Sequence, residues 1–289
     1  MAQGRTIVCG VDDSETAVAV TDAARWLAEG LGARLLIVHV VEEPSVDPAE
    51  LRASVRERSG ANEEDVRVLP QGPPADRLLE TARGEDAELL VVGSRGRRSL
   101  HSTVLGSVSR TLATRADRPV VIVPPEVRFS APGTTGAEST SASVVCGVDG
   151  SDHARAAAAL GGRLAARLGH RLVLVHALQD VKAAFAYLGA HGGTPPVTAQ
   201  PDAQRNQASG ILDDALRSAG VEATLVIESG PPWDVLESVA EREHGRLLVV
   251  GARGLGGIRS TLFGSVAAHV AASATRPVVV LPGSARVEP

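Results

Sequence analysis

Two stretches of the chain carry the same glycine pattern, which could bring backbone amides close to a phosphate group. Residues 91–110 read VVGSRGRRSLHSTVLGSVSR, and residues 249–268 read VVGARGLGGIRSTLFGSVAA. In each stretch two glycines separated by two residues follow an apolar run, and after nine further residues Gly-Ser opens an expected helix. Glycine permits close backbone approach because no Cβ intrudes, and the first amides of a helix attract anions. The pattern therefore indicates either two phosphate sites or two tight packing turns.

The repetition extends beyond these stretches and divides the chain into two copies. IVCGVDDS at 7–14 matches VVCGVDGS at 144–151, and RPVVIVP near the end of the first copy matches RPVVVLP near the end of the second. A chain of 289 residues is long enough for two ordinary domains, each with its own core. We predict a first domain at 1–126, a linker at 127–142 and a second domain at 143–284.

Composition excludes several classes of function. Hydrophobic residues make up 44% of the chain and charged residues 22%, which is typical of a globular protein. A net charge of −5 argues against binding to nucleic acid, since that affinity comes mostly from cations that neutralise phosphates. The 2% of aromatic residues leave few side chains on which bases can stack. With no membrane span and no leader pattern at the start, we expect a cytoplasmic protein.

Each copy alternates short apolar runs with amphipathic stretches, which predicts an α/β fold with a largely parallel sheet. We expect the first helices of the two copies to begin at Ser14 and Ser151, because serine is a good N-cap. A short second helix is expected at 48–57 in the first copy and a fuller one at 203–219 in the second. The strands of the first copy are expected near residues 6–11, 34–40, 65–69, 88–92 and 119–123.

The apolar runs RPVVIVP and RPVVVLP would be exposed strand edges unless they were paired. We therefore expect pairing within the chain or between chains. A ligand in a doubly wound sheet lies at the carboxyl ends of the strands, where the strand order reverses. Asp12 follows the first strand and Gly93 follows the fourth, so both are expected there.

Together these residues resemble the universal stress protein family, as two tandem domains. The glycine pattern is similar to that of the ATP-binding branch of the family, and Asp12 and Asp149 match its aspartate at the end of the first strand. The resemblance implies two Rossmann-like domains, each a doubly wound five-stranded parallel sheet in the order 3-2-1-4-5. It also implies a pseudo-dimer in which the domains pair through their last strands, and adenine pockets lined by Val40 and Ala177.

The predicted ligand is an adenine nucleotide, ATP. The aspartates are expected to accept hydrogen bonds from ribose hydroxyls, and the Gly-Ser amides to bind phosphate oxygens. In the first copy the predicted binding residues are Asp12, Val40, Gly93, Arg95, Gly96, Gly106, Ser107, Val108 and Ser109. In the second copy they are Asp149, Ala177, Gly251, Arg253, Gly254, Gly264, Ser265 and Val266.

The two predicted sites differ in their phosphate-binding groups. Ser109 offers a hydroxyl where the second copy has Ala267. The first copy also has Arg95, Arg97 and Arg98, whereas the second has Arg253 and Arg259; the alternative for these arginines is a solvated loop face. We predict that both sites bind and that the first holds the terminal phosphate more tightly.

The sequence shows no group placed to catalyse a reaction. It has no Walker Gly-Lys-Ser/Thr and no acidic cluster for a metal, so any Mg²⁺ would be held by phosphates and water. We interpret His39 and His176, which recur at strand ends, as structural hydrogen-bonded histidines, and Cys9 and Cys146 as buried thiols. No catalytic or metal-ligating residue is predicted.

Three functions remain open. The first is an ATP-dependent regulatory switch in stress adaptation, which need not be an enzyme. The second is a slow ATPase, and the third is an architectural dimerisation protein with vestigial sites. We also expect a homodimer through a surface other than the intramolecular one. The segment 178–205 is either a lid or a partner-binding loop.

Overall fold

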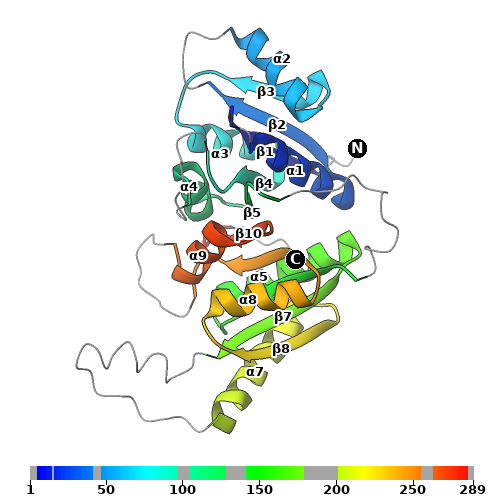
Figure 1. Ribbon diagram of the computed structural model, residues 1–289, viewed down its shortest axis with the longest axis vertical. Coiled ribbons are helices and arrows are strands. Elements are labelled where there is room, and N and C mark those ends of the chain that lie inside the picture. Colours follow the sequence, from blue (N-terminus) through cyan, green and yellow to red (C-terminus); the bar gives the residue numbers. More distant parts are fainter. Residues whose placement is uncertain are drawn as a thin grey trace, which may run out of the picture.

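The computed structural model describes residues 5–14, 16–41, 47–96, 105–127, 141–178, 201–254 and 263–285 (Figure 1). The first half contains β1 (Thr6–Val11), α1 (Ala17–Leu31), β2 (Arg34–Val40), α2 (Pro48–Ser59), a 3-10 turn (Glu63–Asp65), β3 (Val66–Leu69), α3 (Pro74–Gly84), β4 (Ala87–Gly93), α4 (Ser107–Arg115) and β5 (Val120–Val123). The second half contains β6 (Ser143–Gly147), α5 (Asp152–Leu168), β7 (Arg171–Leu178), α7 (Pro201–Ala219), β8 (Ala223–Ser229), α8 (Pro232–Arg242), β9 (Gly245–Gly251), α9 (Ser265–Ser273) and β10 (Val278–Leu281). Most of the predicted linker and of the 178–205 segment lies outside the described residues.

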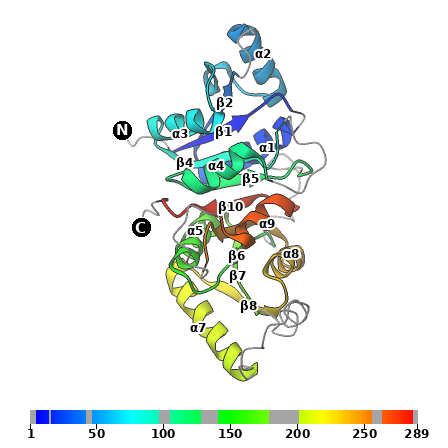
Figure 2. The same cartoon turned by 90° about the vertical axis from the view of Figure 1, so that its left-hand side faces the viewer.

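Ten strands of the described chain form one continuous sheet in the order β3-β2-β1-β4-β5-β10-β9-β6-β7-β8. Each half is a parallel sheet with the predicted order 3-2-1-4-5, and helices cover both faces (Figure 2). The halves join where β5 and β10 run antiparallel, with Val121 opposite Val279. This pairing confirms the expectation that the two apolar edge strands pair with each other. Both valines are fully buried by it.

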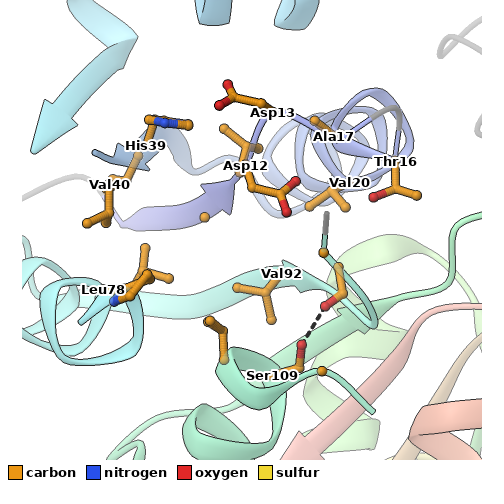
Figure 3. A pocket seen from close by; sticks show the side chains of 18 of the residues that line it. Asp12, Asp13, Thr16, Ala17, Val20, His39, Val40, Leu78, Val92 and Ser109 are labelled. Atoms are coloured by element: carbon orange, nitrogen blue, oxygen red, sulfur yellow. Dashed lines mark hydrogen bonds between the residues drawn. The ribbon is translucent and has the colours of Figure 1, made fainter. Parts of the chain in front are cut away.

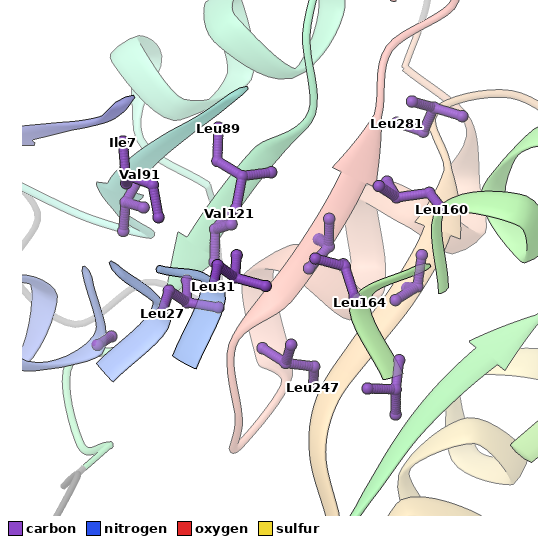
Figure 4. Packing of buried hydrophobic residues seen from close by; sticks show 14 of the residues in the cluster. Ile7, Leu27, Leu31, Leu89, Val91, Val121, Leu160, Leu164, Leu247 and Leu281 are labelled. Atoms are coloured by element: carbon purple, nitrogen blue, oxygen red, sulfur yellow. The ribbon is translucent and has the colours of Figure 1, made fainter. Parts of the chain in front are cut away.

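The core lies on both faces of this sheet, and on each face it runs through the junction. Leu27 of α1, Val121 of β5 and Leu164 of α5 belong to one buried cluster that spans both halves (Figure 4). Such strands are rich in Val, Ile and Leu because both of their faces are covered. Burying one such side chain contributes about 1.5–3 kcal/mol, so the junction stabilises both halves.

Polar contacts add to the junction at its rim. Arg167 at the end of α5 pairs with Glu88 and donates to the carbonyl oxygen of Leu31. Trp26 of α1 stacks on His170, with the ring centroids 5.9 Å apart. The carboxyl ends of α1 and α5 therefore meet across the junction.

The first helices of the two halves begin differently. Ser151 is the N-cap of α5 as predicted, and its hydroxyl accepts from the Ala154 amide at 3.1 Å. The prediction for Ser14 is wrong, because α1 begins at Ala17 after Thr16 and has no side-chain cap. The Ser14 hydroxyl donates instead to Asp12, so it does not cap the helix.

The residue before each serine explains part of this difference. Gly150, before Ser151, has φ of 89°, a conformation that glycine adopts without steric cost. The first half has Asp13 at the equivalent place, for which that conformation is unfavourable. The turn that lets Ser151 reach the helix amides is therefore tied to glycine.

Substitution of Gly162 tests the packing of α5 against α7. A methyl group there would lie 3.0 Å from the carbonyl carbon and 3.2 Å from the Cα of Ala219, both backbone atoms. We predict that Gly162→Ala lowers the free energy of unfolding by about 1–3 kcal/mol, because α7 must shift. Gly210→Ala is the control, since a methyl group there meets nothing within 4 Å and alanine should stabilise the helix by about 0.5–1 kcal/mol. Urea unfolding measures both, and wild-type stability for Gly162→Ala would contradict this packing.

The two cysteines provide a pH test of the core. Cys9 and Cys146 are fully buried, and burial raises the pKa of each thiol to about 12. Both thiols should resist iodoacetamide at pH 8 in the native protein and react after unfolding, as mass spectrometry would show. Because the unfolded thiols ionise first, their contribution to stability should be complete below about pH 9 and decline as the pH rises toward 12. Rapid alkylation of the folded protein would show that these strands are accessible.

Candidate functional site

A cavity of about 220 Å³ lies at the carboxyl ends of β1, β2 and β4, where the strand order of the first half reverses (Figure 3). All nine residues that the sequence predicted for the first copy line it: Asp12, Val40, Gly93, Arg95, Gly96, Gly106, Ser107, Val108 and Ser109. The structure thus brings together residues that lie far apart in the sequence.

The cavity has an apolar end and a polar end. Val40 and Leu78 line the apolar end, Val92 lies near the middle, and Asp12 and Thr16 lie toward the other end (Figure 3). Such a division suits a ligand with one flat apolar part and one polar part.

Sequence reasoning missed several of the lining residues. Leu78 had a usable signal, because the segment that contains it recurs in the second copy with Leu236 at its place. Both leucines lie against a glycine of the first strand: a methyl group on Gly10 would be 2.7 Å from Leu78, and one on Gly147 would be 3.0 Å from Leu236. Other lining residues outside the prediction include Thr16, Ala17, Val20, His39, Leu51 and Pro74.

Asp12 is held between the start of α1 and the glycine loop. One carboxylate oxygen accepts from the backbone amide of Ser14 at 3.1 Å and from its hydroxyl. The other faces Gly96, where a Cβ would lie 2.6 Å from it. A side chain at the second glycine of the pattern would therefore displace the Asp12 carboxylate.

The second copy repeats this contact. Asp149 accepts from the Ser151 amide at 3.0 Å through one oxygen, and a Cβ on Gly254 would overlap its other oxygen. Glycine at these two positions thus leaves room for a carboxylate oxygen. This is a second reason for glycine, beside the close backbone approach that the sequence indicated.

The glycine before each fourth helix closes the loop by a backbone hydrogen bond. The Gly106 amide donates to the Ser94 carbonyl oxygen at 2.8 Å, and the Gly264 amide donates to that of Ala252 at 2.8 Å. The expectation that the Gly106 amide faces a phosphate is thus wrong, because this bond uses its proton. No side chain caps α4 or α9. The first intrahelical bonds are those from the Arg110 and Ala268 amides, so the three amides before each of them, at 107–109 and 265–267, have no intrahelical acceptor.

Ser109 has a structural contact. Its buried hydroxyl donates to the Gly93 carbonyl oxygen at 2.6 Å, which ties α4 to the end of β4. The single hydroxyl proton is therefore used within the protein, so Ser109 does not give the first site the extra phosphate donor that the sequence predicted. Arg95 lines the cavity, and its buried Nε has no hydrogen-bond partner. Arg97, Arg98 and Arg259 lie outside the described residues.

The strand-end histidines have different surroundings. His176 Nδ1 lies 2.8 Å from the Val148 carbonyl oxygen, so its predicted structural hydrogen bond is confirmed. His39 is buried and lines the cavity, and burial lowers the pKa of its imidazole. At the rim, Asp13 pairs with Arg58 of α2 at 2.9 Å.

The remaining predicted residues of the second copy lie at the equivalent strand and helix ends. Gly251 ends β9, Ala177 lies near the end of β7, and Ser265 begins α9. Val266 packs partly buried against the core. The repeated sequence has therefore folded into a repeated backbone arrangement.

The sequence profile of the Universal stress protein family matches residues 4–124 and 141–282. The chain belongs to the Universal stress protein family. A universal stress protein of Mycolicibacterium smegmatis is 31% identical over 307 residues, which cover 95% of this chain and 96% of that protein. A universal stress protein of Mycobacterium tuberculosis is 30% identical over 298 residues, covering 95% of each chain.

Solved structures show the same fold for the universal stress protein domains. The crystal structure of a universal stress protein from Archaeoglobus fulgidus has a TM-score of 0.62 at 19% identity, and covers 97% of this chain and 99% of that one. Among the described residues of the present protein, no helix is long and apolar enough to cross a membrane. Nor do three or more metal-ligating side chains gather in the part of the chain that the structure describes.

Ser109→Ala tests the structural contact of this side chain. We predict that it lowers the free energy of unfolding by about 1–3 kcal/mol, because the Gly93 carbonyl loses its donor. Thr111→Ala is the matched control on the same helix: it removes a hydroxyl that donates to the Ser107 carbonyl oxygen at 2.8 Å and should change stability by less than about 0.5 kcal/mol. Urea unfolding compares the two variants. An unchanged stability for Ser109→Ala would show that the hydrogen bond to Gly93 does not stabilise the fold, so that the Ser109 hydroxyl of the wild type is available to a ligand.

Proposed function

We propose that the protein binds ATP in the cavity of the first domain and at the equivalent site of the second, and that it acts as a nucleotide-dependent regulatory module. The observation that carries this proposal is the convergence of all nine predicted residues on one cavity at the reversal of strand order. Ligands of doubly wound sheets bind at that place.

The two ends of the cavity match the two ends of a nucleotide. Val40 and Leu78 supply apolar contacts for an adenine ring. Asp12, fixed by Ser14, supplies an acceptor for ribose hydroxyls. The uncapped start of α4 and the Arg95 guanidinium supply donors and positive charge for phosphate oxygens.

We propose a regulatory role over an enzymatic one because the charged groups around the cavity suit binding. Asp13 is paired with Arg58. In this proposal Mg²⁺ accompanies ATP and is held by phosphate oxygens and water.

We also propose that the protein forms a homodimer through a surface other than the β5–β10 junction, because pairing within the chain already buries that junction. Sedimentation with and without ATP tests this proposal. A dimer in either condition supports it, and a monomer in both contradicts it.

Gly96→Ala tests the nucleotide site of the first domain. The new methyl group would push Asp12 from its place, so we predict that ATP affinity at this site falls at least about tenfold, the effect of losing one charged hydrogen bond. Isothermal titration with ATP measures the affinity and the number of sites.

Gly84→Ala is the matched control, because a methyl group there meets nothing within 4 Å and the residue lies away from the cavity at the end of α3. It should bind ATP like the wild type. Unchanged ATP affinity and stoichiometry in a folded Gly96→Ala protein would contradict this site.

A further inference from the structure

The second domain has a pair of side chains beside its glycine loop that the first domain lacks. His153 lies in the first turn of α5, and Arg253 lies between the two glycines that follow β9. At the equivalent positions the first domain has Thr16 and Arg95. At these two positions the arginine is shared, and the second site has a histidine in place of a threonine.

Both side chains approach the same point, next to Gly283 after β10. A Cβ on Gly283 would lie 3.1 Å from the guanidinium carbon of Arg253 and 3.2 Å from His153 Nε2. Either contact is tighter than two unbonded groups prefer, so glycine here leaves room for both side chains. The first domain has Pro125 at this position.

The backbone of the same turn lies against the start of the glycine loop. A Cβ on Gly251 would lie 3.1 Å from the carbonyl oxygen of His153. In the first domain a Cβ on Gly93 would instead be 3.2 Å from the side chain of Val20. The beginning of α5 therefore borders the second loop closely, in line with its earlier start at Asp152 after the Ser151 cap.

Two nitrogen-bearing side chains thus converge beside the loop, and within the described residues neither has a hydrogen-bond or ion-pair partner. The Arg253 guanidinium has only donors, and an imidazole Nε2 donates when it carries the proton. An anion between them would accept from both groups and screen the positive charge. The loop already leads toward the uncapped start of α9.

We propose that His153 and Arg253 hold the outer phosphates of the nucleotide in the second domain, so that this site distinguishes ATP from AMP more strongly than the first does. The inference rests on the proposed nucleotide binding. It assigns His153 a direct contact with phosphate.

The test exchanges the histidine for the residue of the first domain. His153→Thr should weaken ATP binding at the second site about tenfold and leave AMP binding within about twofold, since AMP lacks the outer phosphates. Isothermal titrations with ATP and with AMP are made in the Gly96→Ala background, which weakens the first site. His153→Gln retains a side-chain N–H donor and should restore part of the ATP affinity.

The outcomes separate this inference from the proposed function. If the wild-type protein binds neither nucleotide, the proposed function itself fails. If it binds ATP and His153→Thr leaves the ratio of ATP to AMP affinity unchanged, the phosphate contact alone is wrong. An equal loss of ATP and AMP affinity would also overturn it, because that result indicates structural damage to the turn.

Discussion

The reversal of strand order between β1 and β4 is the constraint on which the site depends. Because β2 lies on one side of β1 and β5 lies beyond β4, the connections that leave these strands diverge and open a crevice at their carboxyl ends. Asp12 at the end of β1 and the loop after β4 meet across this crevice. Gly96 is the point of contact, since a Cβ there would displace the Asp12 carboxylate.

The second domain keeps this constraint and changes what surrounds it. Asp149 and Gly254 repeat the contact of Asp12 and Gly96, so the duplicated sequence preserves the geometry on which the site depends. The helix that follows β6 starts earlier, with Ser151 as its cap. This small shift at one helix start brings the first turn of α5 against the glycine loop. Two domains with the same strands therefore differ in the side chains that border their glycine loops.

Much of the fold could be predicted because its signals are local and occur twice. The apolar runs fix the strands, and the repeated RPVV segments indicated that two edges must be covered, which the β5–β10 pairing confirms. The residues around the first cavity could be predicted because the glycine spacing and Asp12 follow strands that a parallel sheet brings to one edge. The predictions that failed, for Ser14 and Ser109, depend on side-chain contacts that the sequence does not display. Ser14 and Ser151 look alike as caps, yet Ser14 bonds Asp12, and Ser109 bonds Gly93.

If the doubled glycine loops are nucleotide sites, the protein should retain nucleotide when it is purified. The protein is purified without added nucleotide and denatured, and the released adenine nucleotides are quantified by chromatography against the protein concentration. We expect retained ATP, approaching two molecules per chain. A protein that releases no nucleotide and then fails to bind ATP in titration would contradict it, and both loops would serve packing alone.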